Sequence, residues 1–186
     1  MSEIKPISDK LVKVKLNELH VRYIPVVTPL DIWKKNMNLM FSPHLHLMEN
    51  FEKYGFDLSR LKKTDYYEER KYRYSIGMKR WTEEKIREHL KDRYNIFISI
   101  KKYGYDKNKD KANPIKVLKT PFWKSRFNLE LPWLGGMEIW NGAGRCSAAL
   151  FLGYKELPVL MVRDTRPGTM NKGKFESKLR GVNGVW

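Results

Sequence analysis

The sequence has little cysteine and no long apolar run. A single cysteine, Cys146, among 186 residues cannot form an internal disulfide and excludes zinc fingers built on cysteine ligands. No stretch of the sequence approaches the roughly 20 apolar residues that a helix needs to cross a bilayer. The N-terminal segment mixes lysine with aliphatic residues and lacks the apolar centre of a signal peptide. We therefore expect a protein of the reducing cytoplasm with no membrane partner.

Acidic residues are also scarce relative to basic ones. Lysines and arginines number 37 against 21 aspartates and glutamates, which gives a formal net charge of +16 and a pI near 9.8. Such a charge attracts polyanions and speeds their encounter with the protein. Nucleic acid, with DNA favoured, is therefore the expected partner, and a charge that serves only solubility is the alternative.

What the sequence does contain is a compact α/β pattern between Met137 and Asp164. An alternating segment leads into a glycine-rich turn, an apolar run of helical length follows, and a second apolar segment begins after Gly153. Pro158 stands near the start of that last segment, at a position that suits the edge of a sheet. The pattern predicts a strand over 137–140, a turn over 141–144, a helix over 146–152 and a buried strand over 157–162.

The glycine turn has the properties of an anion site. Gly142 and Gly144 allow positive φ and close backbone approach, and the first N–H groups of the following helix have no partner within that helix. Arg145 adds a permanently charged fork that suits phosphate oxygens. A plain tight turn with a solvated arginine is the alternative. The predicted binding residues are Asn141, Gly142, Ala143, Gly144, Arg145, Cys146 and Ser147.

These residues resemble the signature turn of the ParB/sulfiredoxin superfamily. There a strand ends in Gly-x-x-Arg, an alanine-rich helix follows, and a Leu-Gly…Pro-Val segment returns into the sheet. Here the matching residues are Gly142-x-x-Arg145-x-x-Ala148-Ala149, Leu152-Gly153 and Leu157-Pro158-Val159. A second block in the correct order, Ile98-Ser99-Ile100-Lys101-Lys102-Tyr103-Gly104 with Asn113-Pro114-Ile115-Lys116-Val117, is similar to the family's preceding helix, loop and strand.

The resemblance covers roughly residues 82–164 and implies an α/β (α+β) fold, a small mixed sheet with flanking helices. It makes residues 1–164 one domain and leaves the basic segment of about 42–80 as a helical insertion. Residues 165–186 remain as a basic tail, which we expect to order on a polyanion. In that tail Gly168-x-x-x-x-Gly173-Lys174 has the spacing of a Walker phosphate loop, but Phe175 stands where a serine or threonine must hold magnesium.

The resemblance also implies a nucleotide. Members of the superfamily bind nucleotide phosphates at this turn, so we expect ATP, ADP or CTP, with Mg²⁺ offsetting the phosphate charge. The implied activity is phosphoryl transfer, or nuclease or nucleotide hydrolysis, on or along nucleic acid. Ala143 stands where sulfiredoxin has its reactive cysteine, and Ala143-Gly144 replaces the Glu-Arg of the partition proteins, so neither of those two activities is expected.

The residue that would act as a general base is open. Glu138 precedes the turn on its strand and Asp164 ends the next strand, and these are the two candidates. The alternative function is a non-catalytic DNA- or RNA-binding adaptor or assembly protein in which the nucleotide site is vestigial. The sequence does not indicate an oligomeric state.

Basic residues interleave with tyrosines between Leu58 and Arg80, and lysines fill the loop 105–113. This composition suits phosphate contacts combined with base stacking, and a solvated helix face with tyrosines tucked into the core explains the 58–80 segment as well. The predicted nucleic-acid contacts are Arg70, Lys71, Arg73, Lys79, Arg80, Lys107, Lys109 and Lys111.

Capping signals predict two helices. Ser42-Pro43 begins one that Gly55 ends, and Thr82 begins another, in which a break between Asp92 and Asn95 stays open. His44 and His46 lie two apart, so they diverge on a helix and no metal site is expected. The buried stripe predicted for the second helix is Ile86, Leu90, Ile96, Phe97 and Ile100, and a strand is predicted over Leu11–Leu16.

Overall fold

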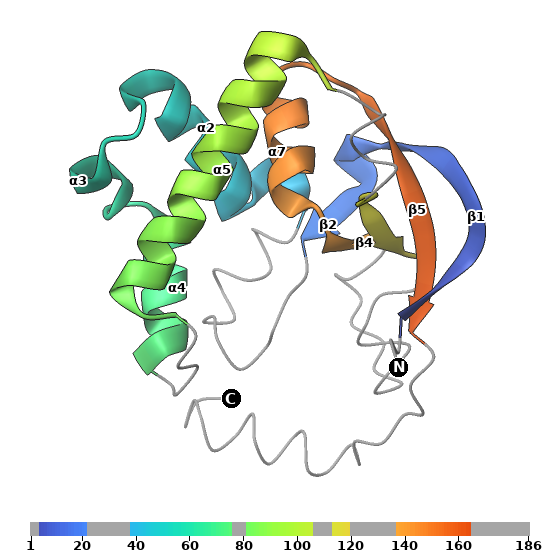
Figure 1. Cartoon of the computed structure of the whole chain (residues 1–186), viewed down its shortest axis with the longest axis horizontal. Coiled ribbons are helices and arrows are strands. Elements are labelled where there is room, and N and C mark those ends of the chain that lie inside the picture. The colour runs from blue at the N-terminus through green and yellow to red at the C-terminus, as the bar shows by residue number, and fades with distance from the viewer. Residues whose placement is uncertain (1–3, 22–37, 76–80, 106–112, 120–136, 165–186) are drawn as a thin grey trace.

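The computed structural model describes residues 4–21, 38–75, 81–105, 113–119 and 137–164 (Figure 1). The predictions for the tail 165–186 and for most of the lysine-rich loop lie outside these residues. The elements are β1 (Ile4–Lys15), η1 (Leu16–Glu18), β2 (Leu19–Val21), η3 (Leu39–Phe41), α2 (Pro43–Tyr54), α3 (Leu58–Leu61), α4 (Asp65–Ser75), α5 (Glu83–Tyr103), β3 (Lys116–Leu118), β4 (Met137–Asn141), α7 (Ala143–Phe151) and β5 (Glu156–Asp164).

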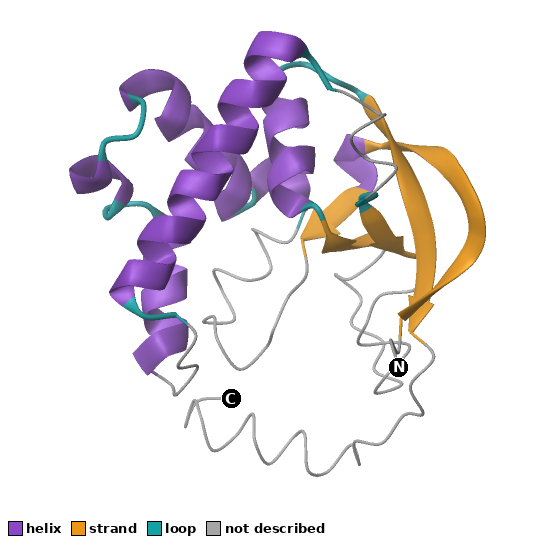
Figure 2. Cartoon of the chain, in the orientation of Figure 1, coloured by secondary structure: helices purple, strands orange, loops and turns teal. Residues whose placement is uncertain are grey.

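The described strands form one mixed five-stranded sheet in the order β1-β5-β3-β4-β2. β1 is antiparallel to β5 and β3 is antiparallel to β4, whereas β3 is parallel to β5 and β2 to β4. Figure 2 shows the helices gathered on one side of the molecule and the strands on the other. The α+β class expected from the sequence is therefore confirmed.

The core between α7 and the sheet is aliphatic. Its buried members come from every strand and from α7, where Cys146 and Ala149 face the sheet. Pro158 on β5 pairs with Lys13 of β1, and β3 begins only opposite Leu160. At Pro158, β5 therefore pairs with β1 alone among the described strands, and its other side is the edge position that the sequence predicts for this proline.

The second core lies among the helices. Residues of α2, α3 and α4 pack with α5 and with Ala148 of α7. The segment 42–75 is thus part of the helical layer. Tyr66 and Tyr67 of α4 are 0% and 4% exposed. For these two residues the tyrosines are tucked into the core, as one of the two interpretations of this segment predicts.

The predicted caps of α2 and α5 are confirmed. The Ser42 hydroxyl accepts from the Leu45 amide at 3.4 Å, and the Thr82 hydroxyl accepts from the Lys85 amide at 3.3 Å. Gly55 ends α2 with φ of 63°. α5 runs unbroken through residues 92–95, because Arg93 and Tyr94 pack inward, where their neighbours hold the helix.

Candidate anion-binding site

The turn between β4 and α7 requires glycine at its first position. Gly142 has φ of 102° and ψ of 15°, in the left-handed region, and a Cβ there would lie 2.9 Å from the Ile115 side chain. The first hydrogen bond of α7 joins the Cys146 amide to the Gly142 carbonyl at 3.0 Å. The N–H groups that precede this bond point out of the helix end. They belong to Ala143, Gly144 and Arg145.

Arg145 folds back over the turn. Its Nη1 donates to the Asn113 carbonyl at 2.6 Å, while the Asn141 side chain donates to the Asn113 side chain at 3.2 Å. The Arg145 Nη2 atom lies 3.2 Å from the place where a Cβ on Gly142 would stand. The arginine therefore connects the turn to the loop before β3, and its guanidinium stays beside Gly142.

Cys146 and Ser147 are predicted binding residues whose side chains face the interior. Cys146 is fully buried in the core under α7. The Ser147 hydroxyl donates to the Ala143 carbonyl at 2.8 Å, within the same helix. The structure therefore brings the backbone of 142–145 and the Arg145 side chain to the turn, and directs these two side chains away from it.

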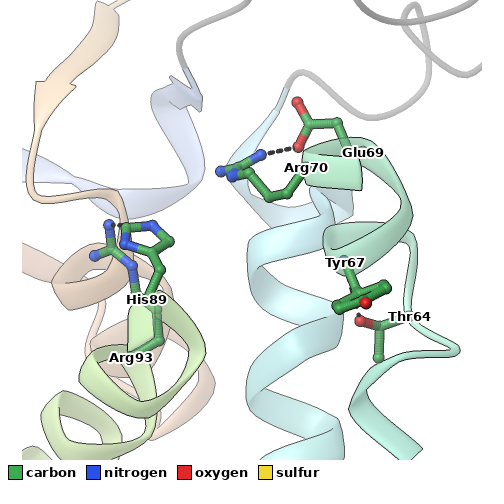
Figure 3. A network of polar contacts seen from close by, with 6 residues as sticks. All are labelled: Thr64, Tyr67, Glu69, Arg70, His89 and Arg93. Atoms are coloured by element: carbon green, nitrogen blue, oxygen red, sulfur yellow. Dashed lines mark hydrogen bonds and ion pairs between the residues drawn. The ribbon is translucent and has the colours of Figure 1, made fainter. Parts of the chain in front are cut away.

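A second arginine reaches the turn from α5. A Cβ on Gly144 would lie 2.1 Å from Nη1 and 2.6 Å from Cδ of Arg93, so a larger residue at this position would displace the end of the arginine side chain. The Arg93 Nη2 atom lies 3.4 Å from Nε2 of His89, one turn earlier on α5 (Figure 3). The His89 ring stacks on Tyr66 with centroids 6.2 Å apart and meets Trp81 edge-on at 5.3 Å.

Arg93 and His89 are not among the candidates from the sequence, although a signal is present. The buried residues Ile86, Leu90, Phe97 and Ile100 recur every three or four positions. Arg93 falls between Leu90 and Phe97 in that series, on the buried face of the helix. A cation at a core position is the pattern that marks a buried polar site.

Arg70, which the sequence places among the nucleic-acid contacts, is buried and not at the surface. It is 5% exposed and pairs with Glu69 (Figure 3). Its guanidinium lies over the rings of Tyr66 at 4.3 Å and Trp81 at 4.9 Å. Burial alone would lower the pKa of Arg70, but Tyr66 and Glu69 hold that pKa above its ordinary value. The guanidinium is therefore a buried, permanent cation.

The other predicted nucleic-acid contacts are only partly described. Lys71 is exposed on α4, where it is open to solvent. Arg73 lies on the same helix, and its side chain is outside the described residues, as are Lys79, Arg80, Lys107, Lys109 and Lys111. For these residues nucleic-acid contact stays a prediction.

The two candidate bases lie apart. Glu138 is 2% exposed on β4, and side chains alternate along a strand, so it leaves the sheet on the face opposite Ile139, which packs in the core under α7. Asn141 and Leu160 both pair with Lys116, so the backbone of Asp164 lies four residues, or about 13 Å, beyond the level of Asn141. Glu138 therefore lies on the sheet face opposite α7, and the backbone of β5 leads away from the turn before it reaches Asp164.

A second basic feature lies on the sheet. A hollow of about 530 Å³ has lysines from β1 and Lys119 around an apolar floor that includes Val14 and Met161. Glu18 and Glu156 also line it, and Glu18 pairs with Lys15 at 3.6 Å. The lysines are Lys10, Lys13, Lys15 and Lys119.

Within the described ranges, no three histidine, cysteine, aspartate or glutamate side chains gather as metal ligands would, and no helix has the length and apolar character to cross a membrane. Comparisons of the chain with protein-family models, curated proteins and solved structures give no match. The assignment of a function therefore depends on the chemistry of the turn.

Proposed function

We propose that this chain binds a nucleoside di- or triphosphate, with its phosphates at the N-terminus of α7. One arrangement is the basis of the proposal. The amides of the first turn of α7 follow Gly142, which has a left-handed backbone conformation, and two arginines from different helices, Arg93 and Arg145, lie against that turn. A helix N-terminus carries about half a positive charge and suits phosphate oxygens. Arginine forks add the charge-assisted hydrogen bonds that phosphate favours.

The local order of elements supports the ParB/sulfiredoxin-like interpretation. β4, the Gly142-x-x-Arg145 turn, α7 and β5 follow one another as that resemblance implies, and so do α5 and β3. Asn113 contacts both Asn141 and Arg145, so the two resembling blocks meet at the turn. ATP, ADP and CTP with Mg²⁺ are therefore the nucleotides to test.

The chemistry that follows binding is phosphoryl transfer or hydrolysis on or along nucleic acid, as the resemblance implies. In that reaction the α7 amides and arginines would stabilise charge on the transferring phosphoryl group, and Mg²⁺, when bound, would supply further neutralisation of the phosphate charge. Because Glu138 lies on the sheet face opposite α7 and the backbone of Asp164 lies about four residues beyond the level of the turn, we assign the base to neither.

The test changes only the charge at the first residue of α7. Ala143→Asp places a carboxylate where phosphate would bind, and Ala143→Asn has the same size without the charge. Aspartate at this position stabilises a helix by about 0.3 to 1 kcal/mol, so weaker binding cannot be attributed to unfolding.

The measurement is isothermal titration of each variant with ATP, ADP and CTP in magnesium buffer. We expect Ala143→Asn to bind one nucleotide close to the wild-type affinity and Ala143→Asp to bind it at least 10-fold more weakly. Equal binding by the two variants, or no binding of any nucleotide by the wild type, would refute the proposed function.

The lysine-lined hollow on the sheet favours a second candidate, a nucleic-acid-binding adaptor that needs no nucleotide. For that function, Lys13→Gln and Lys119→Gln should weaken binding of a DNA duplex and reduce the salt slope by about 0.9 for each phosphate that the variant no longer neutralises. A nucleotide-dependent protein would instead change its DNA affinity when nucleotide is added.

A further inference from the structure

Two arginines contact the α7 turn at different residues. Arg145 stands beside Gly142 and is tied to the Asn113 carbonyl. Arg93 stands against Gly144, and it belongs to α5, some fifty residues earlier in the chain. The turn is thus bracketed by one cation from its own helix and one from the helical layer.

The position of Arg93 is electrostatically unfavourable without an anion. Its guanidinium lies at the positive end of α7, where a cation is repelled. Among the described residues no ion pair joins it to a carboxylate, and its buried Nε has no hydrogen-bond partner. Its Nη2 atom contacts His89, a residue that carries no negative charge.

The helical layer contains a further arginine, the buried Arg70. Arg70, more than nine-tenths buried, shares the Trp81 ring with His89, and its Nε likewise has no hydrogen-bond partner among the described residues. Glu69 supplies the carboxylate that pairs with Arg70. Arg70 thus has its own counter-charge, whereas the Nε of Arg93, unsatisfied within the described ranges, is an N–H donor whose missing partner is an acceptor with negative charge.

We infer that Arg93 is a second phosphate-binding arginine of the α7 turn, and that the site takes a ligand with two linked phosphoryl groups. The inference rests on the proposed function and adds a residue and a ligand class to it. Two arginines and the helix end present about +2.5 charges, whereas a single phosphomonoester carries about −1.5 to −2. A second linked phosphoryl group supplies the missing negative charge.

His89 acts as a positioning residue for Arg93. Arginine can only donate, so Nε2 of His89 is the acceptor in the 3.4 Å contact between them. The rings of Tyr66 and Trp81 fix the imidazole from two directions. The guanidinium is therefore held in place before the ligand arrives, which lowers the entropy cost of binding.

The test compares inorganic phosphate with pyrophosphate, and AMP with ADP, by isothermal titration of the full chain without magnesium. The variant is Arg93→Gln, and the matched control is Arg87→Gln, which removes the same charge from an exposed position of α5. Removal of one charge-assisted hydrogen bond corresponds to about 10- to 100-fold in affinity. We expect Arg93→Gln to weaken binding of pyrophosphate and ADP by that factor, and binding of phosphate and AMP by less than threefold.

The outcomes distinguish failure of the inference from failure of the proposed function. If wild type binds ADP and Arg93→Gln binds ADP equally well, the inference is overturned and the proposed function stands. If wild type binds neither diphosphate here and no nucleotide in the magnesium titrations, the proposed function fails and the inference fails with it; if it binds a nucleotide with magnesium but neither diphosphate here, only the inference is overturned. If Arg93→Gln loses affinity for phosphate and for pyrophosphate by the same factor, Arg93 does not recognise the second phosphoryl group and the inference is overturned. Arg93→Lys, which keeps the charge, should recover part of the preference for two phosphoryl groups.

Discussion

The two cores of this protein differ in the kind of side chain that fills them. The core between α7 and the sheet buries valine, leucine, isoleucine, alanine and cysteine, whereas the helical core buries Phe51, Tyr66, Tyr67 and Phe97. Aromatic faces attract cations, which aliphatic side chains do not. The buried Arg70 accordingly lies over the Tyr66 and Trp81 rings, beside the helical core.

The two cores position different parts of the candidate site. The aliphatic core fixes β4 and α7, and hence the backbone amides of the turn. The helical layer supplies Arg93 to that turn, and the His89 ring that contacts Arg93 packs against Tyr66 and Trp81. The two contributions meet at one contact, where Arg93 of α5 passes over Gly144 of α7.

The largest expected loss of stability comes from truncating a buried aromatic side chain of the helical core. Phe97 is 1% exposed and packs against Phe51 and Phe151 with centroids 6.1 and 5.8 Å apart. Phe97→Ala should reduce the free energy of unfolding by about 3 to 5 kcal/mol. Leu157→Ala in the aliphatic core is the comparison, at about 2 to 5 kcal/mol.

Urea denaturation, followed by far-UV circular dichroism and by tryptophan fluorescence, shows whether the helical layer and the sheet unfold together or separately. We expect a single coincident transition for both variants, since Ala148 of α7 packs in the helical core while its neighbour Ala149 packs in the other. Separate transitions in Phe97→Ala would show that the helical layer folds independently of the sheet.

The contact between the cores is tested by a double-mutant cycle. Gly144→Ala places a Cβ against the flexible end of the Arg93 side chain, which must move aside, so we expect the clash to cancel the roughly 1 kcal/mol by which alanine favours a helix over glycine. In an Arg93→Ala background the same change should stabilise by up to about 1 kcal/mol, because alanine favours the helix more than glycine. Additive effects in the cycle, measured by urea denaturation, would argue against the contact.

The smallest effect concerns a polar link within the helical layer. The Tyr67 hydroxyl donates to Glu83, which also pairs with Lys62. Burial, followed by this hydrogen bond, raises the pKa of Tyr67 to about 12. The folded-state pKa is above the ordinary value of 10, so the stabilisation is complete below pH 10 and is lost as the pH rises from 10 through 12.

Tyr67→Phe should therefore reduce stability by about 1 kcal/mol at pH 8. The difference from wild type should shrink between pH 10 and 12, as followed by urea midpoints. A difference that stays constant over this range would mean that the hydroxyl does not titrate with a raised pKa.

The sequence predicts well what local signals determine. Ser42, Thr82 and Gly55 cap their helices where expected, because capping depends on residues within one turn. The predictions of a strand over 157–162 and of a helix after Gly142 are also confirmed, the strand extending to Glu156–Asp164. Alternation and apolar runs are enough for these elements.

The features that the sequence does not predict depend on contacts between distant segments. The charged neighbours of Arg70 in the sequence indicate a surface position, yet the packing of α4 on α5 and Trp81 buries it. The register of β5 against β3 sets the position of Asp164, which no local pattern indicates. The close approach of Arg93 to Gly144 is visible only in the fold, because the two residues lie on different helices.

The most direct test of the proposed site is an amide ¹H–¹⁵N correlation experiment on the full chain, titrated with ADP and with pyrophosphate. We predict saturable shifts that are largest at the amides of Ala143, Gly144 and Arg145, because their N–H groups would donate to the phosphate oxygens. Saturable shifts confined to other residues, or no shifts at millimolar ligand, would contradict an anion site at the N-terminus of α7.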